Sequence, residues 1–502
     1  MLRSVVFVLA FFIAIPAWAQ GFQISEVRFN KSAYLEETAL QEIAHGVVNR
    51  PIVFSDLQAM IVEVQGLYSV RGVLTARAIL PPQEIRDGVL RVELVEASVS
   101  EVRTEGFERT KPEFIARTIS LEAGGLPDFE LLEHDLRVYE ISHDLVPLLS
   151  FAPGDAPGTT VAIITAEEPD RFQWTFSVDN FGTEATGEYR ASVFGRWASV
   201  SGWRDVLSMQ LQASEGSYSG SLGYSRPVGP EGGRIIGTLS YADSSIIEGV
   251  FEPVSILSNS ITGSVFYRRP MRVRPYSHVV FEGGMSGEVS TSTIEGEDFS
   301  DVTLGEFVVQ GAYVRRFDTA LLSATAGVKA GYSDAKDTSE TEGEFYLGYV
   351  AVDYTRRLAD KALLDLSLTG QYAHGQNLPV ARLFSVGGAP SVRGYPNNIR
   401  GGDSGLALKT QISPLKNYEP ESMKDISFSP FAFVDAAVVV PYRIDGSINS
   451  EQDFLASIGA GVRVDWKGQA SGLLMVAWPQ IDTLGFDAKD TTEVYFGLDY
   501  RY

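Results

Sequence analysis

The chain ends with Val494-Tyr-Phe-Gly-Leu-Asp-Tyr-Arg-Tyr502, a stretch in which every even-numbered residue is apolar or aromatic. The odd-numbered positions include a glycine, an aspartate and an arginine. An alternation of period two separates the two sets onto opposite faces of a β-strand. Because a tilted strand of about 9–11 residues is long enough to cross a bilayer, this stretch predicts a membrane-spanning strand.

The same alternation recurs throughout the last two-thirds of the chain. It is clear at 207–213 and 364–372, and no helical period interrupts it after Arg171. Tight turns alternate with longer connections, and we expect long acidic loops at 290–301 and 334–344. This combination is typical of an outer-membrane barrel, whereas a soluble β-sandwich, the alternative, usually has tight connections. We count about 16 candidate strands, an even number as a single-chain barrel requires, beginning near residues 171, 187, 204, 217, 234, 260, 276, 303, 321, 343, 361, 405, 427, 453, 470 and 493.

Residues 1–19 have the pattern of a secretory signal peptide. A positively charged start precedes an apolar run that Pro16 ends, and Ala17-Trp18-Ala19 matches a signal-peptidase site. Cleavage is therefore expected after Ala19. Farther along the sequence there is no run of about 18 apolar residues of the kind that a transmembrane helix needs.

Two small α+β modules, 20–96 and 97–168, are predicted between the signal peptide and the barrel, which we assign to 169–502. Each has the order β-α-α-β-β, and the units are spaced by roughly 75 residues, which indicates a tandem repeat. In the first, Ser55-Asp56 is expected to cap the second helix. The expected elements are a strand at 22–30, helices at 34–48 and 55–68 and strands at 74–80 and 89–96, and then a strand at 99–105, helices at 112–120 and 129–143 and strands at 146–151 and 160–166.

Composition excludes several kinds of function. Lys and Arg total 41 against 64 Asp and Glu, a net charge of -23 that does not suit binding to nucleic acid. There is no Cys, and the five His are scattered, so neither disulfides, a thiol nucleophile nor a metal site is expected. The tetrapeptide Gly402-Asp-Ser-Gly405 is like a serine-protease nucleophile motif, but no matching His and Asp pattern accompanies it. We therefore expect no enzyme activity and no cofactor.

One connection, 383–402, between the eleventh and twelfth predicted strands, is too long for a simple turn. It contains Leu383-Phe-Ser-Val-Gly-Gly-Ala-Pro-Ser-Val-Arg-Gly-Tyr395. Gly387 and Gly388 allow a tight bend, and Gly394 allows a positive φ or a close approach to a wall. A long structured loop of this kind is usually functional, so we predict that it folds into the barrel.

Arg393 is the only charged residue between Phe384 and Tyr395, and a guanidinium inside a barrel needs a carboxylate partner. In the thirteenth predicted strand, Phe433 and Asp435 share a face, opposite an apolar set that must contact lipid. Asp435 is therefore the expected lumenal partner of Arg393. Asp365 and Asp499 are also expected to face inward and remain alternative partners.

These residues carry a resemblance to a known family. Val392-Arg393-Gly394-Tyr395 after Gly387-Gly388 resembles the loop motif of the two-partner secretion transporters, in the superfamily that also holds the barrel-assembly insertases. Phe433-Val434-Asp435 resembles the partner-strand motif, although Ala437 stands where the family usually has Gly. The two modules look like POTRA domains, and 81–96 and 177–183 are similar to the haemolysin/haemagglutinin branch. Since the first predicted strand begins just after the cleavage site, we expect no plug helix before it.

The resemblance implies an outer-membrane transporter with its POTRA modules in the periplasm. It would capture an unfolded partner protein, expected to be β-helical and encoded nearby, and secrete it through the barrel. Activation of a haemolysin- or haemagglutinin-like passenger is left open. Two alternatives are an insertase that assembles outer-membrane barrels and a passive porin or receptor, which would leave the modules and the arginine-bearing loop unexplained. The expected partners are the passenger and outer-membrane lipid, and nucleic acid is not expected.

Overall fold

The computed structural model describes residues 22–249, 252, 254–336, 341–373, 378–440, 453–483, 485–489 and 491–502. The predicted signal peptide lies outside the described residues, as does the segment in which we expect no plug helix. By its packing the chain divides into two compact units. The described part of the first comprises 22–105, 121–132 and 148–165, and the second comprises 106–120, 133–147 and the described residues from 166 to the end.

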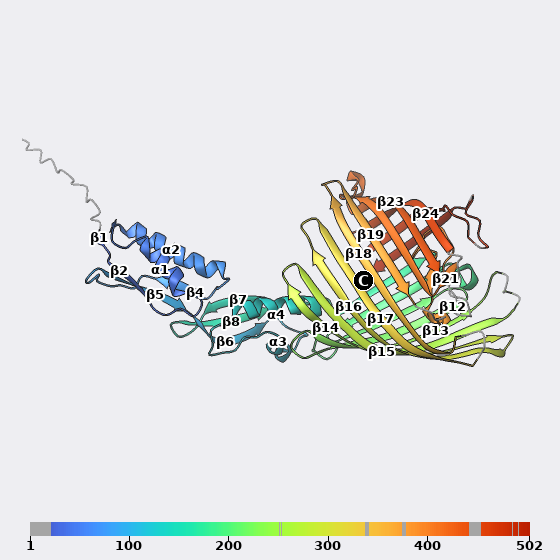
Figure 1. The fold of residues 1–502 in the computed structure, drawn as a ribbon, viewed down its shortest axis with the longest axis horizontal. Helices are drawn as coiled ribbons and strands as arrows, with labels where there is room; N and C mark the ends of the chain where they lie inside the picture. The colour runs from blue at the N-terminus through green and yellow to red at the C-terminus, as the bar shows by residue number, and fades with distance from the viewer. Residues whose placement is uncertain are drawn as a thin grey trace, which may run out of the picture. The chain divides into compact units, whose positions relative to one another are not determined.

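The first module is a three-stranded sheet with two helices (Figure 1). Its central strand β5 pairs in parallel with β2 and antiparallel with β4. Apolar side chains from the helices and the sheet, among them Leu40, Val64 and Leu90, are buried in one core. The elements are β1 (Phe22–Gln23), β2 (Glu26–Phe29), α1 (Glu37–His45), β3 (Pro51–Ile52), α2 (Phe54–Val70), β4 (Ala76–Ile79) and β5 (Val89–Glu96).

The elements that follow have the same order along the chain, although α3 and most of α4 belong to the second compact unit. Strand β8 pairs in parallel with β6 and antiparallel with β7. None of the described helices is long and apolar enough to cross a membrane. The elements are β6 (Ser98–Glu105), α3 (Pro112–Thr118), α4 (Phe129–Ser142), β7 (Leu148–Pro153) and β8 (Thr159–Thr165).

In the first module one local prediction is wrong and another, the cap of α2 at Ser55-Asp56, is correct only for Asp56. The strand expected at 22–30 is two short strands, because β1 pairs with β3 while the backbone N–H groups of Ser25 and Glu26 donate to the Gly88 carbonyl and lead the chain to β5. Ser55 does not cap α2. The helix begins at Phe54, and the carboxylate of Asp56 accepts the backbone N–H of Val53 at 2.8 Å, which satisfies one free donor of the first turn.

Within the described residues, sixteen antiparallel strands close into a barrel in which β9 pairs with both β10 and β26. This confirms the predicted fold class. The strands are β9 (Phe172–Asp179), β10 (Arg190–Ala198), β11 (Val206–Ala213), β12 (Ser217–Val228), β13 (Gly233–Ser245), β14 (Ile256–Arg274), β15 (Ser277–Ile294), β16 (Glu297–Arg316), β17 (Ala320–Ala335), β18 (Gly343–Leu358), β19 (Ala362–Tyr372), β22 (Ser404–Pro414), β23 (Ile426–Val440), β24 (Asp453–Trp466), β25 (Ala470–Pro479) and β26 (Glu493–Arg501).

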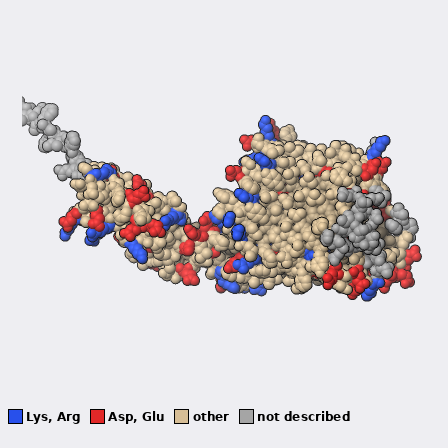
Figure 2. All heavy atoms as spheres, viewed as in Figure 1, with Lys and Arg blue, Asp and Glu red and all other residues tan. Residues whose placement is uncertain are grey.

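The outer surface of the barrel is suited to lipid. Large apolar side chains such as Leu239, Phe307 and Leu498 are more than half exposed on alternate strand positions. On the face that Figure 2 shows, charged side chains gather toward the ends of the barrel and are sparse in the band between them. An outer wall of this kind fits a membrane-spanning barrel, in which only the lipid-facing positions must be apolar.

The strands of the barrel differ widely in length. Strands β15 and β16 have 18 and 20 residues, whereas β9 and β11 have 8 each. The long acidic loop predicted at 290–301 is therefore wrong: β15 and β16 continue through it and meet in a turn at Glu295 and Gly296, both with positive φ. The run of Ser, Thr and Ile at 290–294 is paired with β14 residue by residue despite its polar character. The loop predicted at 334–344 is shorter than expected, and 337–340 lie outside the described residues.

The barrel closes between its first and last strands through a short pairing. Strand β9 pairs with β26 over five residue pairs, from Gly497↔Asp179 to Arg501↔Thr175. By contrast, β14 and β15 are paired along the whole of 256–274. The closing pair consequently has far fewer backbone hydrogen bonds than the long pairs do.

Candidate functional site

The predicted loop lies between β19 and β22 and packs against the inner wall of the barrel. Its two ends form a small ribbon in which β20 (Phe384–Val386) pairs with β21 (Arg400–Gly402). Residues from the loop share one buried apolar cluster with residues from the wall, so the loop is packed against the wall. The cluster contains Val386, Val392, Tyr395, Ala407, Ala437, Val439 and Leu455.

The three loop glycines are required by the backbone. Gly387, Gly388 and Gly394 have φ values of 115°, 77° and 96°, a region that L side chains rarely adopt. At Gly388 a Cβ atom would collide with the side chain of Asn397. At Gly394 a Cβ atom would lie 3.2 Å from the Cβ of Ala477 on β25. These positions therefore combine an unusual conformation with close approach, as the sequence predicted.

Arg393 and Asp435 form the predicted pair. The Arg393 Nε atom donates to Oδ2 of Asp435 at 2.7 Å, and Nη2 donates to Oδ1 at 2.8 Å. The backbone N–H of Arg393 adds a third bond to the same carboxylate, at 3.2 Å. Asp435 is fully buried, Arg393 is 5% exposed, and the guanidinium lies 3.5 Å from the centre of the Phe433 ring. The arrangement is a bidentate, charge-assisted fork with a cation–π contact.

The other two candidate carboxylates are engaged elsewhere. Asp365 accepts the hydroxyl of Thr355, and Asp499 accepts the hydroxyl of Ser177 at 2.5 Å. The inward direction of Asp435 agrees with the alternation of β23, because Phe433 is buried with it while Val434 between them is 54% exposed. Parity had placed all three carboxylates on the inner face, and the contacts in the structure select Asp435 among them.

Neighbouring wall residues complete the contacts of the motif. The backbone N–H of Gly394 donates to the Tyr495 hydroxyl at 2.9 Å, and the Tyr395 hydroxyl donates to the Ile481 carbonyl at 2.8 Å. Lys409 of β22 donates to the Ala389 carbonyl at 3.0 Å. The methyl of Ala437, where the family usually has Gly, is buried in the cluster with Val392 and Tyr395.

A second set of ion pairs holds the beginning of the loop, and sequence reasoning missed it. Arg382 donates to Glu306 of β16 at 2.8 Å and to Glu288 of β15 at 3.0 Å. Lys329 of β17 lies 3.5 Å from the same Glu306, which is 5% exposed. Two features of the sequence could have indicated this ion pair. Arg382 lies just before the loop motif that begins at Leu383, and Glu306 occupies a strand position between apolar residues. Because 290–301 was predicted to be a loop, the strands on either side of it, which carry Glu288 and Glu306, were not considered as partners of the loop.

The opposite end of the loop is fastened by Asn397, whose side-chain amide donates to the Phe181 carbonyl at 2.6 Å in the connection between β9 and β10. Three groups of polar contacts, at Arg382, Arg393 and Asn397, thus attach one loop to different parts of the wall. No cluster of three or more His, Asp or Glu that could hold a metal occurs in the described part of the chain. The arrangement positions a segment inside a lumen.

A membrane barrel that follows two periplasmic-type modules and carries a fastened lumenal loop defines an outer-membrane protein of the transporter class. Comparison with known proteins agrees. The family described as haemolysin secretion/activation protein ShlB/FhaC/HecB matches residues 158–464, more than half of the chain, and the ShlB-type POTRA domain matches residues 22–97. The chain therefore belongs to the ShlB/FhaC/HecB family.

Similar proteins include two named transporters. The heme/hemopexin transporter protein HuxB of Haemophilus influenzae is 24% identical, over 88% of this chain and 81% of the relative. The outer membrane transporter CdiB of Dickeya dadantii is 23% identical, over 91% of this chain and 83% of the relative. Among solved structures, CdiB from Escherichia coli aligns with a TM-score of 0.71 at 17% identity, covering 100% of this chain and 94% of that one, which supports the fold.

Proposed function

We propose that this protein captures an unfolded partner protein in the periplasm and secretes it across the outer membrane through its barrel. The observation that carries this proposal is the fastened loop. A barrel of about sixteen strands encloses a lumen wide enough for a channel. Here a loop packed against the wall and held by several ion pairs occupies part of that lumen, an arrangement suited to a path that opens for a particular substrate.

The modules are suited to capture. Each sheet has two edge strands, β2 and β4 in the first and β6 and β7 in the second. An unfolded chain can add to such an edge through backbone hydrogen bonds, which need little sequence specificity. On β4 the Gln65 side chain already bonds the Ala76 carbonyl and the Ala78 N–H, so a bound segment would displace it there, as it would not on β7. Leu148 on β7 is 64% exposed and Ile79 on β4 is 41% exposed, so apolar side chains accompany both edges. Transient binding of extended segments is the function that this geometry supports.

The partner is proposed to be a large β-helical protein encoded beside this one, of the haemolysin or haemagglutinin kind. No nucleotide-binding motif occurs in the sequence, and energy would come from folding of the passenger as it emerges outside the cell. Activation of the passenger during export is not part of this proposal.

The alternative function is assembly of other outer-membrane barrels. Loss of an insertase would lower the amounts of many barrel proteins, whereas loss of a dedicated transporter would affect one passenger. A passive porin, the second alternative, would require neither modules nor a fastened loop. Quantitative proteomics of outer membranes from a deletion strain separates these possibilities.

Deletion of residues 22–96 tests the capture role. This segment has its own buried core and contributes no barrel strand, so the truncated chain should still insert and remain heat-modifiable on gels. Secretion of the neighbouring passenger should be lost. Normal export by the truncated chain would contradict capture by the first module, and degradation of the modules by protease added to intact cells would contradict a periplasmic position.

A further inference from the structure

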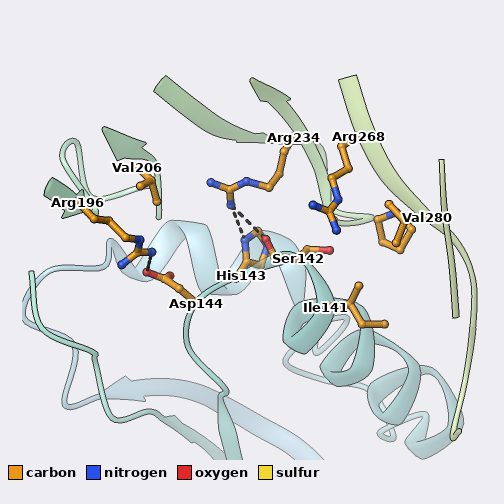
Figure 3. Close-up of a pocket in the computed structure, with 11 residues that line it drawn as sticks. Ile141, Ser142, His143, Asp144, Arg196, Val206, Arg234, Arg268 and Val280 are labelled. Carbon is orange, nitrogen blue, oxygen red and sulfur yellow. Dashed lines mark hydrogen bonds and ion pairs between the residues drawn. The ribbon is translucent and has the colours of Figure 1, made fainter. Parts of the chain in front are cut away.

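A second polar site lies at the barrel end where the chain leaves the modules. A cavity of about 230 Å³ is bounded by the last turn of α4 and the strands β10, β13, β14 and β15 (Figure 3). Four arginines belong to this region: Arg196, Arg234 and Arg268 line the cavity, and Arg204 lies beside it. Asp144 is the only carboxylate in the lining.

The single carboxylate serves two of the arginines. Arg196 donates to Oδ2 of Asp144 at 2.6 Å, and Arg204 donates to Oδ1 at 2.8 Å. Arg204 is 1% exposed and also lies 3.9 Å from Glu168. Although burial alone would raise it, hydrogen bonds from Arg204 and Arg196 lower the pKa of Asp144, so this carboxylate stays ionised. Its charge is already shared by two guanidinium groups.

Among the residues that the structure describes, the hydrogen bonds of Arg234 all go to neutral groups, although the charges of Asp144 and Asp205 also act on it. It donates to the Ser142 carbonyl at 3.2 Å, which is favourable at a helix C-terminus, and to the Ser225 hydroxyl at 2.8 Å. It also lies 3.3 Å from Nδ1 of His143. Burial, together with the charge of Arg234, lowers the pKa of His143 to about 3. The neutral ring therefore accepts a hydrogen bond and adds no positive charge.

Arg268 faces Arg234 directly across the β13–β14 pair. Like charges in this position destabilise a sheet. Figure 3 shows both side chains directed toward the end of α4. Within the part of the chain that the structure describes, Arg268 makes no ion pair, and Glu282 opposite it on β15 accepts a hydrogen bond from Gln310. The buried hydroxyl oxygen of Ser142 also has no hydrogen-bond partner there.

We propose that this cavity binds a carboxylate side chain of the polypeptide that enters the barrel, held by the guanidinium of Arg268 and the hydroxyl of Ser142. This inference rests on the proposed function and names a chemical class of substrate segment, an acidic one. Arg268 offers a fork of donors that forms no ion pair among the described residues, and Arg234 supplies a second positive charge without a direct carboxylate partner there. An anion here would also relieve the repulsion between the two arginines.

The strand pattern favours a polypeptide over a lipid as the source of the anion. Ile235 and Tyr267, the neighbours of Arg234 and Arg268, are exposed on the outer face at 46% and 38%. Since side chains alternate along a strand, the two arginines point to the inner face. The barrel wall thus separates the cavity from the lipid headgroups, while a chain moving from the periplasm into the lumen passes the cavity.

Binding of a fluorescent hexaglutamate peptide to the purified full-length protein in detergent micelles tests the proposal, with hexaglutamine as the uncharged probe. Fluorescence anisotropy should report binding of hexaglutamate alone. Arg268→Glu should weaken that binding by about tenfold or more, the loss expected for a charge-assisted hydrogen bond. Ser142→Ala should weaken it by a smaller factor. Both variants must keep the heat-dependent gel shift of a folded barrel.

The matched control is Arg274→Glu, which places the same charge change on an exposed arginine at the end of the same strand, outside the cavity. Equal weakening by Arg268→Glu and Arg274→Glu, or no weakening by either, would overturn the proposal. Binding of inorganic phosphate that depends on Arg268, without binding of hexaglutamate, would overturn the assignment to a polypeptide. These measurements need no secretion, so failure of the proposed transport function would be seen separately, as absence of passenger export by the wild-type protein.

Discussion

Replacing Arg393 by Ala tests the role of the fastened loop. The substitution removes two side-chain hydrogen bonds to Asp435, of 2.7 and 2.8 Å, and leaves that carboxylate with the backbone N–H at 3.2 Å. Because Asp435 is fully buried and then keeps only Lys409, opposite it on β22, as a nearby cation, loss of Arg393 should cost up to about 3–5 kcal/mol, the range for one partner of a buried pair. The cation–π contact with Phe433 is lost as well.

A double-mutant cycle isolates the pair from these other losses. Asp435→Ala leaves Arg393 with the Gln411 side chain at 3.3 Å and with Phe433, so it should also destabilise the protein. The double variant has neither buried charge. Its free energy of unfolding should therefore exceed the additive expectation by about 2–3 kcal/mol, the upper range for residues in direct contact. Urea unfolding in micelles, followed by tryptophan fluorescence, measures each corner of the cycle.

Two further measurements sharpen the test. Arg393→Ala paired with Asp499→Ala is the matched control and should be additive, since Asp499 accepts hydrogen bonds from Ser177. Secretion of the passenger should fall far more than the amount of folded barrel, because the lipid-facing strands do not depend on the loop. Additive effects of Arg393→Ala and Asp435→Ala, with a coupling below about 0.5 kcal/mol, would refute the reasoning.

Three other predictions concern different parts of the barrel unit. Burial lowers the pKa of His143 from 6.5 to about 3, so between these pH values the unfolded segment binds more protons than the folded one. Hydrogen exchange over 133–147 should therefore show that the opening free energy at about pH 5.5 is lower by about 1.4 kcal/mol than at neutral pH. His143→Phe should abolish this difference, whereas His134→Phe, at an exposed position, should retain it. Arg382→Ala should loosen the beginning of the loop and raise channel conductance in planar bilayers, and an unchanged conductance would show that Glu306 and Glu288 do not hold it. Gly394→Val should impair export about as strongly as Arg393→Ala, because positive φ and close approach to β25 both disfavour a side chain there; normal export would mean that the loop tolerates displacement.

The barrel and the central ion pair could be predicted because both depend on a period of two. Alternation identified the starts of the strands to within a few residues in most cases, and the same alternation placed Asp435 on the inner face. The glycine positions could be predicted because few other residues adopt positive φ. In each case the information is local, within a strand or a tight turn.

Contacts between distant segments could not be predicted in this way. The partners of Arg382 come from β15 and β16, more than seventy residues earlier, and the adjoining polar stretch was assigned to a loop because its Ser, Thr and Asp content is typical of loops. The arginines around Asp144 come from separate strands and a turn. These residues become neighbours only when the barrel closes, and the pattern of a short stretch of sequence does not predict which strands become neighbours.

Unequal strand lengths have a consequence for the surrounding bilayer. A strand needs about 9–11 residues to cross the hydrocarbon region at the usual tilt, and β9 and β11, with 8 each, fall short of this length while β14 and β15 exceed it. A short hydrophobic wall is matched by local thinning of the bilayer, at a cost of fractions of a kcal/mol per ångström. The thinned annulus would lie beside the closing pair of β9 and β26, so the composition and thickness of the membrane should influence how readily that pair separates.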